Sequence, residues 1–425
     1  MTSLSAQVRD RGYLPLTLSS HPVGSAQDLL IHVDPVTPGH TNEQVAELFS
    51  LKRQVQNLPV VHGERPMGLI NRSLFHNMMA KPYYPELYSR QSCIAFMDKN
   101  PLVVETDTRI DTLMALAVQT GEKVFADGFI VVDGGCYRGV GQVLDLMRAM
   151  NELQARQHRQ LVDSIDYAST IQSSLLKSSR QALNRSLPDR HWVLWQPRDT
   201  VGGDIFHCLT LEDGFLVSVF DCTGHGVPGA FMTLIAGAAL ERAIARHGHD
   251  DPALLLASMN RYIKQTLSQH DIAQRSQALP DNSDDGLEGV ILRGYPSAGY
   301  VLHTGARMPL IHVRTEGEGQ AEIIRSERCG VGYMATPSGQ VWRNQRLEMA
   351  AGQRLYLASD GVIDQIGGPR RIAFGKKRLL QCLLDTRTLD MAGQKNAFMQ
   401  CFIDYRGRQA PRDDLTLLAL QWPDE

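Results

Sequence analysis

The sequence lacks any cysteine pattern that would hold a disulfide framework or a zinc ion. Its seven cysteines are odd in number and scattered along 425 residues, and no two form a C-x-x-C pair. The 14 histidines also show no H-x-x-x-H spacing. We therefore expect buried or free thiols in a reducing cytoplasm and no zinc site built on thiolates.

The sequence also lacks an excess of one charge and a long apolar run. Its 43 basic and 46 acidic residues leave a net charge of −3, which gives no electrostatic reason to expect nucleic acid or a membrane surface as partner. No stretch approaches the roughly 20 apolar residues of a membrane span. The first residues carry charges without the apolar run of a signal peptide. The sequence therefore predicts a cytoplasmic protein.

Glycine and proline are absent from residues 144–183. Apolar side chains, Ile165 and Ala168 among them, recur there at spacings of three and four, which predicts a helix with one apolar stripe. Gln and Arg dominate residues 154–160, so the segment is one helix or two. Because a stripe this narrow is typical of a two-stranded coiled coil, we expect a homodimer through this segment.

Residues 28–150 contain a weak internal repeat. Each copy has an apolar strand, Leu58–Gly63 in the first and Phe129–Gly134 in the second, followed by another short strand. A helix-like segment precedes each strand pair, at Asn42–Leu51 and at Ile110–Thr120, and a further helix follows it. A repeat of about 70 residues in the order strand, helix, strand, strand, helix predicts a paired α/β unit and not a solenoid.

Two aspartates flank an expected hairpin in the second half of the chain. Asp204 opens the first strand, and Glu212-Asp213-Gly214 reverses the chain. The apolar return strand Phe215–Phe220 ends at Asp221, and a glycine-rich bend then leads into a helix opened by Pro228. A carboxylate beside such a bend lets oxygen atoms approach a hard cation such as Mg²⁺ or Mn²⁺.

Two further strands carry aspartates at their ends. Asp360 follows the apolar strand that starts at Leu355, and the pair Asp413-Asp414 directly precedes the last strand. Taken singly, Asp204 or Asp221 is more often an ordinary turn residue. Taken together, strands far apart in sequence can bring their carboxylates to one sheet edge, as a two-metal centre requires. The regular short strands with turn signals predict a sandwich with flanking helices.

These motifs, in this order, resemble those of the PPM-type (protein phosphatase 2C-like) Ser/Thr phosphatases, and specifically their bacterial SpoIIE/RsbU branch. The resemblance covers roughly residues 190–422 and rests on five segments: Val201–Asp204, Asp221–Met232, Gly305–Leu310, Ser359–Gly361 and Asp413–Leu417. It implies an α-β-β-α sandwich and the hydrolysis of phosphoserine or phosphothreonine on a partner protein.

The resemblance also implies a site for two Mn²⁺ or Mg²⁺ ions. Asp221 would bridge both ions, and the carbonyl oxygen of Cys222 would lie beside it. Asp360 and Asp413 would complete the first metal site, with Asp204 at the second, directly or through water. Only a backbone oxygen is required at Cys222, so a cysteine there is tolerable.

Three nearby features have open roles. Arg198 is a candidate for the phosphate-binding arginine that this branch otherwise lacks. His225 is either a general acid or a residue that stabilises the bend by a hydrogen bond, and the second interpretation is favoured. The polar, turn-rich residues 269–287 stand where the family has a variable flap, so we expect a mobile loop over the site.

The N-terminal repeat resembles a CBS-domain pair, which implies a cleft for an adenine nucleotide. The alternative is a duplicated α/β module that only dimerises, because the adenosine-contacting positions are not recognisable. The segment Ala168–Leu176 resembles the helix that precedes the phosphatase core in the SpoIIE/RsbU branch, where it dimerises and controls activity.

We therefore expect a multi-domain α/β protein with four parts: an N-terminal extension (1–27), a CBS-like regulatory pair (28–150), a helical linker (151–186) and a phosphatase domain (187–425). The leading hypothesis is a regulated phosphatase whose substrate is a phosphorylated STAS-type anti-sigma-factor antagonist or a similar phosphoprotein. The rival hypothesis is an inactive scaffold that sequesters its partner. A third makes nucleotide sensing the output, and the long helix argues against it.

Overall fold

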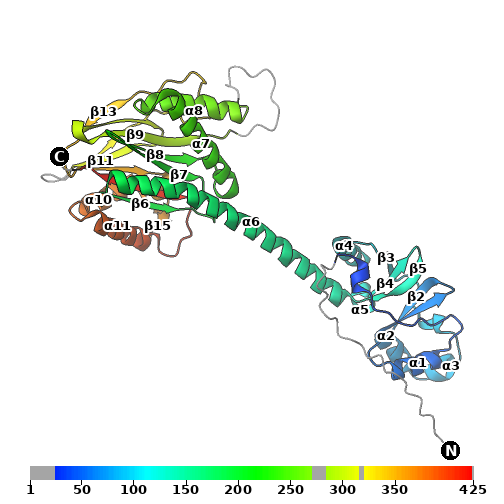
Figure 1. The fold of residues 1–425 in the computed structure, drawn as a ribbon. Coiled ribbons are helices and arrows are strands. Elements are labelled where there is room, and N and C mark those ends of the chain that lie inside the picture. Colours follow the sequence, from blue (N-terminus) through cyan, green and yellow to red (C-terminus); the bar gives the residue numbers. More distant parts are fainter. Residues whose placement is uncertain (1–23, 270–283, 315–319, 424–425) are drawn as a thin grey trace, which may run out of the picture. The chain divides into compact units, whose positions relative to one another are not determined.

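The computed structural model describes residues 24–269, 284–314 and 320–423. The chain divides into two compact units, Met1–Leu161 and Val162–Glu425, and helix α6 begins in the first unit and ends in the second. Figure 1 labels the elements of both units. The expected flap at 269–287 lies almost entirely outside the described residues. All seven cysteines are free, so the expectation of no disulfide is confirmed.

The first unit contains the duplicated order of elements that the repeat predicts. In the first copy the opening strand is reduced to an isolated parallel bridge between Val36 and Val60. The elements of this copy are α1 (Asn42–Leu51), β1 (Asn57–His62), β2 (Arg65–Asn71) and α2 (Arg72–Met79), followed by α3 (Tyr84–Tyr88) and η2 (Cys93–Phe96). Those of the second are β3 (Leu102–Glu105), α4 (Ile110–Thr120), α5 (Glu122–Asp127), β4 (Phe129–Asp133), β5 (Cys136–Gly141) and the start of α6.

The two copies share their apolar cores. Ile130 and Val140 of the second copy pack into the core of the first. The short helix η1 (Ala26–Leu29), which precedes the first copy in sequence, packs into the core of the second. Because each half completes the other, the first unit folds as one body and not as two independent modules.

Helix α6 runs without interruption from Val143 to Ser186. The break considered at residues 154–160 is therefore absent, and the helix that closes the second repeat does not end at Met150. The absence of glycine and proline explains this continuity, since nothing in the segment removes a backbone donor or favours a left-handed residue.

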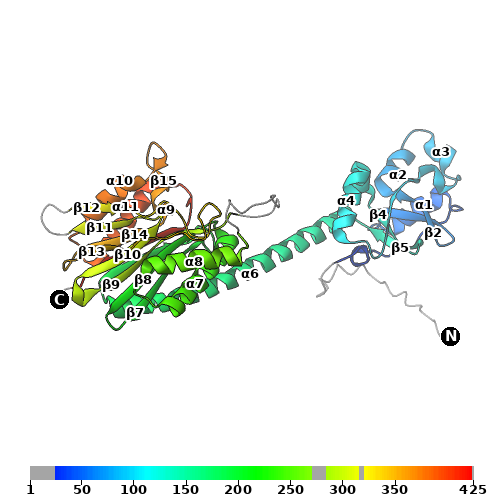
Figure 2. The ribbon, with the colours of Figure 1, turned by 90° about the horizontal axis from the view of Figure 1, so that it is seen from above.

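The second unit contains two five-stranded antiparallel sheets (Figure 2). The first sheet has the order β13-β10-β9-β8-β7, and its strands are β7 (Asp204–Leu211), β8 (Gly214–Cys222), β9 (Leu287–Tyr295), β10 (Tyr300–Ala306) and β13 (Gln345–Glu348). The second sheet has the order β12-β11-β14-β17-β6, and its strands are β6 (His191–Gln196), β11 (Leu310–Arg314), β12 (Gln320–Ile324), β14 (Arg354–Ala358) and β17 (Leu415–Gln421).

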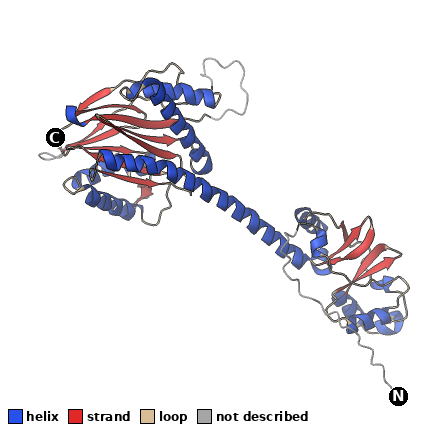
Figure 3. Ribbon diagram, in the orientation of Figure 1, coloured by secondary structure: helices blue, strands red, loops and turns tan. Residues whose placement is uncertain are grey.

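Helices cover the outer faces of this sandwich (Figure 3). Helices α7 (Gly226–His247) and α8 (Pro252–Thr266) pack on the first sheet, and α10 (Gly375–Asp385) and α11 (Met391–Arg406) pack on the second. The short elements α9 (Asp360–Ile363), β15 (Ile366–Gly367), β16 (Ile372–Ala373) and η4 (Pro296–Ala298) complete the unit. The expected α-β-β-α sandwich is therefore confirmed.

Strand β17 illustrates how the sequence selects the layers. Leu418 and Leu420 lie in the core between the sheets, whereas Leu417 and Ala419 lie in the core under α10 and α11. Successive side chains of a strand point to opposite faces, so a continuous apolar run serves both layers. This strand begins directly after the pair Asp413-Asp414, and its burial on both faces fixes that end of the strand in place.

One helix in the described part of the chain, α7, is long and apolar enough to span a membrane by length and composition alone. The expectation that no stretch approaches this limit is therefore wrong. Its residues Ala236, Leu240 and Ala243 are buried in the core of the sandwich. A helix that covers a sheet needs this apolar face, which gives α7 its composition.

Candidate active site

The antiparallel strand order brings the four predicted aspartates to one edge of the sandwich. Asp204 is the first residue of β7 and pairs directly with Asp221 near the end of β8. Asp360 follows β14, and Asp413 precedes β17, its antiparallel neighbour. A strand that ends and a neighbour that begins meet at the same edge of an antiparallel sheet. Strand β8 extends to Cys222, so Asp221 lies within the strand and not after it.

A cavity of about 260 Å³ lies at this edge. Three of the predicted aspartates line it together with the glycine-rich bend after β8, Glu288 of β9 and Tyr333: the full lining is Asp221, Cys222, Thr223, Gly224, His225, Glu288, Tyr333, Asp360 and Asp413. Asp204 lies behind this wall and is only 2% exposed. The lining contains four carboxylates and no lysine or arginine, so the cavity is strongly negative.

Burial, together with neighbouring negative charge, raises the pKa of three of the predicted aspartates. Burial raises the pKa of Asp204 and of Asp221 well above the usual value, and the charges of neighbouring aspartates add to the effect. Burial and the nearby Asp413 raise the pKa of Asp360 to about 6. Asp204 Oδ2 is buried and has no hydrogen-bond partner within the described residues. A group of ionised acids in this environment needs a compensating cation.

The donor set fits hard divalent cations. Carboxylate oxygens are the preferred ligands of Mg²⁺ and Mn²⁺, and the cavity offers several of them without a competing basic side chain. Within the described residues, no three acidic, histidine or cysteine side chains are already arranged so that they could hold an ion. Asp360 is exposed and Asp413 is half-buried, so both carboxylates are accessible from the cavity.

Asp414 anchors the loop that leads to Asp204. Its carboxylate accepts hydrogen bonds from the backbone N–H of Arg198 and of Gly203, each at 2.6 Å. Asp414 is 4% exposed, and burial raises its pKa. The sequence left the role of Asp414 open, and the structure shows that it fixes the backbone beside Asp204.

Glycine is required where this loop meets the bend after β8. A Cβ atom on Gly203 would lie 2.4 Å from the carbonyl oxygen of Gly224 and 2.9 Å from that of Cys222. A Cβ on Gly361 would lie 1.9 Å from the carbonyl oxygen of Asp414. No side chain fits at these distances, so the two glycines allow the turns beside the predicted aspartates to pack directly on one another.

The thiol of Cys222 is buried and unreactive. Burial raises the pKa of the thiol well above its usual value, and the adjacent carboxylates add to this effect. A thiol in such surroundings stays protonated, so it is not a nucleophile. Cys222 contacts the loop of Gly203 through its backbone, since its N–H donates to the Gly203 carbonyl at 3.0 Å.

His225 and Arg198 lie close to the site, and their side chains form hydrogen bonds with the neighbouring loops. The His225 imidazole hydrogen-bonds to the Asp199 carboxylate at 2.8 Å through Nδ1, so it ties the bend to the neighbouring loop, as the favoured interpretation predicted. The Arg198 guanidinium donates to the Arg412 carbonyl at 3.3 Å, and Arg198 does not line the cavity. The structure therefore offers no support for Arg198 as a phosphate-binding residue.

Gln172 connects helix α6 to the same loop. Its side-chain amide donates to the Gly202 carbonyl at 2.7 Å and accepts from the Gly202 N–H at 3.2 Å. The amide also donates to the Thr233 hydroxyl of α7 at 3.2 Å. Gln172 is 4% exposed. A buried glutamine that satisfies both backbone groups of one glycine holds that glycine in a single position.

Sequence reasoning missed Glu288, Tyr333 and Gln172. Glu288 could have been found, because it is an acidic residue near the start of a strand and pairs with Asp221 across the sheet. Tyr333 lies between short irregular segments whose packing no local pattern predicts. Gln172 lies in a helix with many polar residues, so its burial carries no sequence signal.

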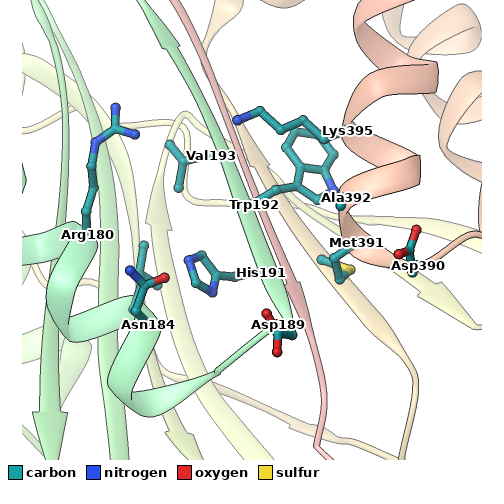
Figure 4. A pocket seen from close by; sticks show the side chains of 11 residues that line it. Arg180, Asn184, Asp189, His191, Trp192, Val193, Asp390, Met391, Ala392 and Lys395 are labelled. Carbon is teal, nitrogen blue, oxygen red and sulfur yellow. The ribbon is translucent and has the colours of Figure 1, made fainter.

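A second cavity, of about 450 Å³, lies between the end of α6, β6 and the start of α11 (Figure 4). Arg180 and Lys395 line it, and so do Asp189 and Asp390. Burial lowers the pKa of Lys395, and the charge of Arg180 lowers it further. The cavity includes none of the predicted site residues. Its two basic and two acidic side chains balance, so it lacks the net charge that would select an ionic ligand.

Comparison with known proteins agrees with this geometry. A family model described as Stage II sporulation protein E (SpoIIE) matches residues 212–423. The solved SiaA-PP2C domain of Pseudomonas aeruginosa is 31% identical, with a TM-score of 0.55. That match covers 63% of this chain and 99% of the domain. None of the curated proteins matches the chain significantly.

Two further solved structures show weaker similarity. The PP2C phosphatase domain of SpoIIE from Bacillus subtilis, solved with a fragment of its regulatory domain, is 15% identical, covers 56% of this chain and 63% of that chain, and has a TM-score of 0.42. The RsbU and RsbW domains of a Mycobacterium tuberculosis protein are 18% identical, cover 56% of this chain and 61% of that chain, and have a TM-score of 0.42. Structures of RsbX with magnesium and of PstP with two manganese ions also match.

The carboxylate cluster predicts an unusual pH dependence of stability for the metal-free protein. The folded state holds the Asp360 proton up to pH about 6, whereas the unfolded chain releases it near the ordinary value of 3.8. Unfolding therefore releases a proton in this range, and the melting temperature in chelator should fall as the pH rises from about 4 to 6. Asp360→Asn should flatten this fall, and Mn²⁺ added at pH 7 should raise the wild-type melting temperature.

The control is Asp385→Asn, which removes an exposed carboxylate on α10 away from the cavity. Calorimetry in chelator across this pH range provides the measurement. A wild-type melting temperature that rises steadily from pH 4 to 6, with the Asp360→Asn protein behaving identically, would contradict the assigned electrostatics.

Proposed function

This chain belongs to the SpoIIE-type PP2C family of protein serine/threonine phosphatases, and we propose that it removes phosphate from serine or threonine on a partner protein with the help of two Mn²⁺ or Mg²⁺ ions. The observation that carries the proposal is the meeting of Asp204, Asp221, Asp360 and Asp413 at one edge of the sandwich. These residues, with the Cys222 carbonyl, would hold the ions.

Each part of the site then has a task. Bound divalent ions would supply an activated water and neutralise the charge that develops on the phosphoryl group. The four aspartates bind the ions, and Asp414 keeps the loop of Asp204 in place. The Asp199–His225 hydrogen bond holds the bend. The presence of all four aspartates favours an enzyme over an inactive scaffold.

The partner we propose is a phosphorylated STAS-type anti-sigma-factor antagonist or a similar phosphoprotein of a cytoplasmic partner-switch pathway. Family membership supports this choice. The cavity is open to a side chain carried on a protein surface, since Asp360 is exposed and Glu288 and Asp413 are half-buried or exposed. Candidate partners can be tested directly by following their phosphorylation state with and without this protein.

We also propose that the first unit regulates the phosphatase through α6. The β-α-β-β-α duplication supports a CBS-like pair whose ligand is an adenine nucleotide. Helix α6 begins at the end of that duplication and carries Gln172, which holds Gly202 two residues before Asp204. A shift of α6 that favours one position of this loop would change metal binding, as coupling between two states requires.

A homodimer through α6 and α7 is part of this proposal. Tyr167 and Ile171 of α6 are 70% and 42% exposed, and Phe231 of α7 is 63% exposed. These residues, with Ala168 and Leu234, line a mostly apolar groove of about 220 Å³. An apolar face of this kind is costly in water, and a second copy of the chain would cover it.

The two-metal assignment predicts the effect of removing Asp221. Asp221→Asn should fold normally and lower phosphatase activity by two to three orders of magnitude or more, and chelation should abolish wild-type activity. Cys222→Ala is the control and should retain most activity, because only its carbonyl is used. Rates on a phosphopeptide with Mn²⁺ give the measurement. Full turnover in excess chelator would rule out the metal assignment.

The regulatory route predicts the effect of removing the Gln172 amide. Gln172→Leu should raise the Mn²⁺ concentration needed for half-maximal activity by about 10-fold or more, as loss of a residue that orients a ligand does. Thr233→Val is the matched control, since it removes the bond to α7 but leaves both bonds to Gly202. An unchanged metal requirement in Gln172→Leu would separate α6 from the site.

The dimer predicts the effect of charges on the apolar face of α6. Ala168 lines the groove, and Ile165 lies on the same helix three residues before it. Ile165→Glu and Ala168→Glu should weaken dimerisation and shift phosphatase activity, because a charge cannot be buried in the dimer interface without a partner. Ser173→Glu adds the same charge at an exposed position of α6 outside the groove and should change neither property. Light scattering at tens of micromolar is the measurement. A wild-type monomer, with unaltered activity in both variants, would end this part of the proposal.

A further inference from the structure

The acidic cavity poses a problem for substrate binding. A phosphate monoester carries up to two negative charges, and the cavity lining holds four carboxylates with no basic side chain. Even with cations bound, a phosphoprotein needs a positive group at the entrance to orient its phosphate. Arg198, the sequence-based candidate, does not line the cavity.

Arg307 does not line the cavity either, but unlike Arg198 its guanidinium contacts two residues that do. Its Nη1 atom is 3.3 Å from Glu288 Oε1, and its guanidinium lies 5.1 Å from the centre of the Tyr333 ring. Both of these partners line the cavity. Glu288 in turn pairs with Asp221 across the β8–β9 ladder. Arg307 is thus one residue away from the predicted metal ligands.

Arg307 has a left-handed backbone conformation, which glycine adopts more easily than arginine does. Its φ angle is +58°, in the left-handed region that non-glycine residues rarely adopt. Its N–H donates to the Glu327 carbonyl at 2.8 Å, and its Nε donates to the Arg328 carbonyl at 3.2 Å. The Nε bond fixes where the guanidinium lies beside Glu288 and Tyr333.

The ion pair with Glu288 is weak enough to exchange. The Arg307 and Glu288 side chains are 41% and 36% exposed, and ion pairs this exposed contribute little to stability. A guanidinium binds phosphate through two parallel N–H donors, which is stronger than this single contact. A phosphate at the cavity mouth would therefore displace the Glu288 carboxylate from Arg307.

We propose that Arg307 binds the phosphate group of the substrate at the entrance to the active-site cavity. This inference rests on the proposed phosphatase function and adds a substrate-binding residue to it. The Tyr333 ring packs against the Arg307 guanidinium, and the Glu288 carboxylate pairs with it while no phosphate is bound. Arg307 would contact the phosphate group itself, so it would bind small phosphate esters and inorganic phosphate as well as phosphoproteins.

The test compares variants that remove or keep the charge. Arg307→Asn removes the charge and suits the left-handed backbone, so it should fold normally, and Arg307→Lys keeps the charge. Arg346→Ala is the matched control. Arg346 also lies over a tyrosine, Tyr300 at 3.7 Å, and pairs with a glutamate, Glu348 at 2.7 Å, but none of the three lines the cavity.

Kinetics with p-nitrophenyl phosphate and Mn²⁺ give KM and kcat, and inorganic phosphate gives an inhibition constant. Arg307→Asn should raise both KM and the inhibition constant about 10-fold, with a smaller change in kcat, and Arg307→Lys should recover part of the loss. Arg346→Ala should match the wild type. A KM and an inhibition constant within twofold of wild type in Arg307→Asn would overturn the assignment.

The proposed phosphatase function and the proposed role of Arg307 would be contradicted by different results. If the wild-type protein with Mn²⁺ hydrolyses neither p-nitrophenyl phosphate nor a phosphopeptide, the proposed function is wrong and this inference falls with it. If the wild type is active and Arg307→Asn is unchanged, only the role of Arg307 is wrong. If only phosphopeptide KM rises, Arg307 binds acidic side chains around the phosphosite, which also overturns the assignment.

Discussion

Repulsion among the carboxylates at one edge of the sandwich sets what the surrounding turns must withstand. Two unit charges 4 Å apart interact by about 4 kcal/mol at the effective dielectric constant of a protein surface, and a whole domain is stable by only about 5–15 kcal/mol. The pKa values of Asp204, Asp221 and Asp360 are raised, so these three carboxylates need compensation to be ionised together. The fold must bring them together firmly enough to resist that repulsion, and cations must then relieve it.

Backbone packing provides that firmness. The turns beside the predicted aspartates contact one another through glycines and main-chain carbonyls, and a buried carboxylate, Asp414, binds two backbone N–H groups of the loop before Asp204. Such contacts leave little freedom, because each buried polar group would lose its partner if the loop moved alone. The loop is also held by Gln172 from α6, so its position and the position of that helix are linked. In the proposed function, a shift of α6 would reach the loop before Asp204 through this contact.

Much of the fold was predictable, because local patterns determine it. The alternating strands and turn signals gave the sandwich, the repeat gave the order of elements in the first unit, and the lack of glycine and proline gave α6. Asp204, Asp221, Asp360 and Asp413 were found because strand ends are visible in sequence. Gln172, Tyr333 and Arg307 were not, since their contacts join segments that are distant along the chain and depend on burial or on a left-handed backbone. The continuity of α6 through residues 154–160 was also left open, because a weak apolar stripe alone does not distinguish one helix from two.

The charges of the cavity also impose an order on binding. The cavity lining holds four carboxylates, and Arg307 contributes one positive charge that already pairs with Glu288. A phosphate dianion that approached the metal-free protein would meet net repulsion, whatever its contacts with Arg307. Only after divalent cations neutralise the aspartates does the potential at the entrance change sign, and the guanidinium then adds to an attraction instead of opposing a repulsion. Any signal that changes how the loop of Asp204 binds a cation would therefore also control whether substrate can enter, through charge alone and without closing the cavity.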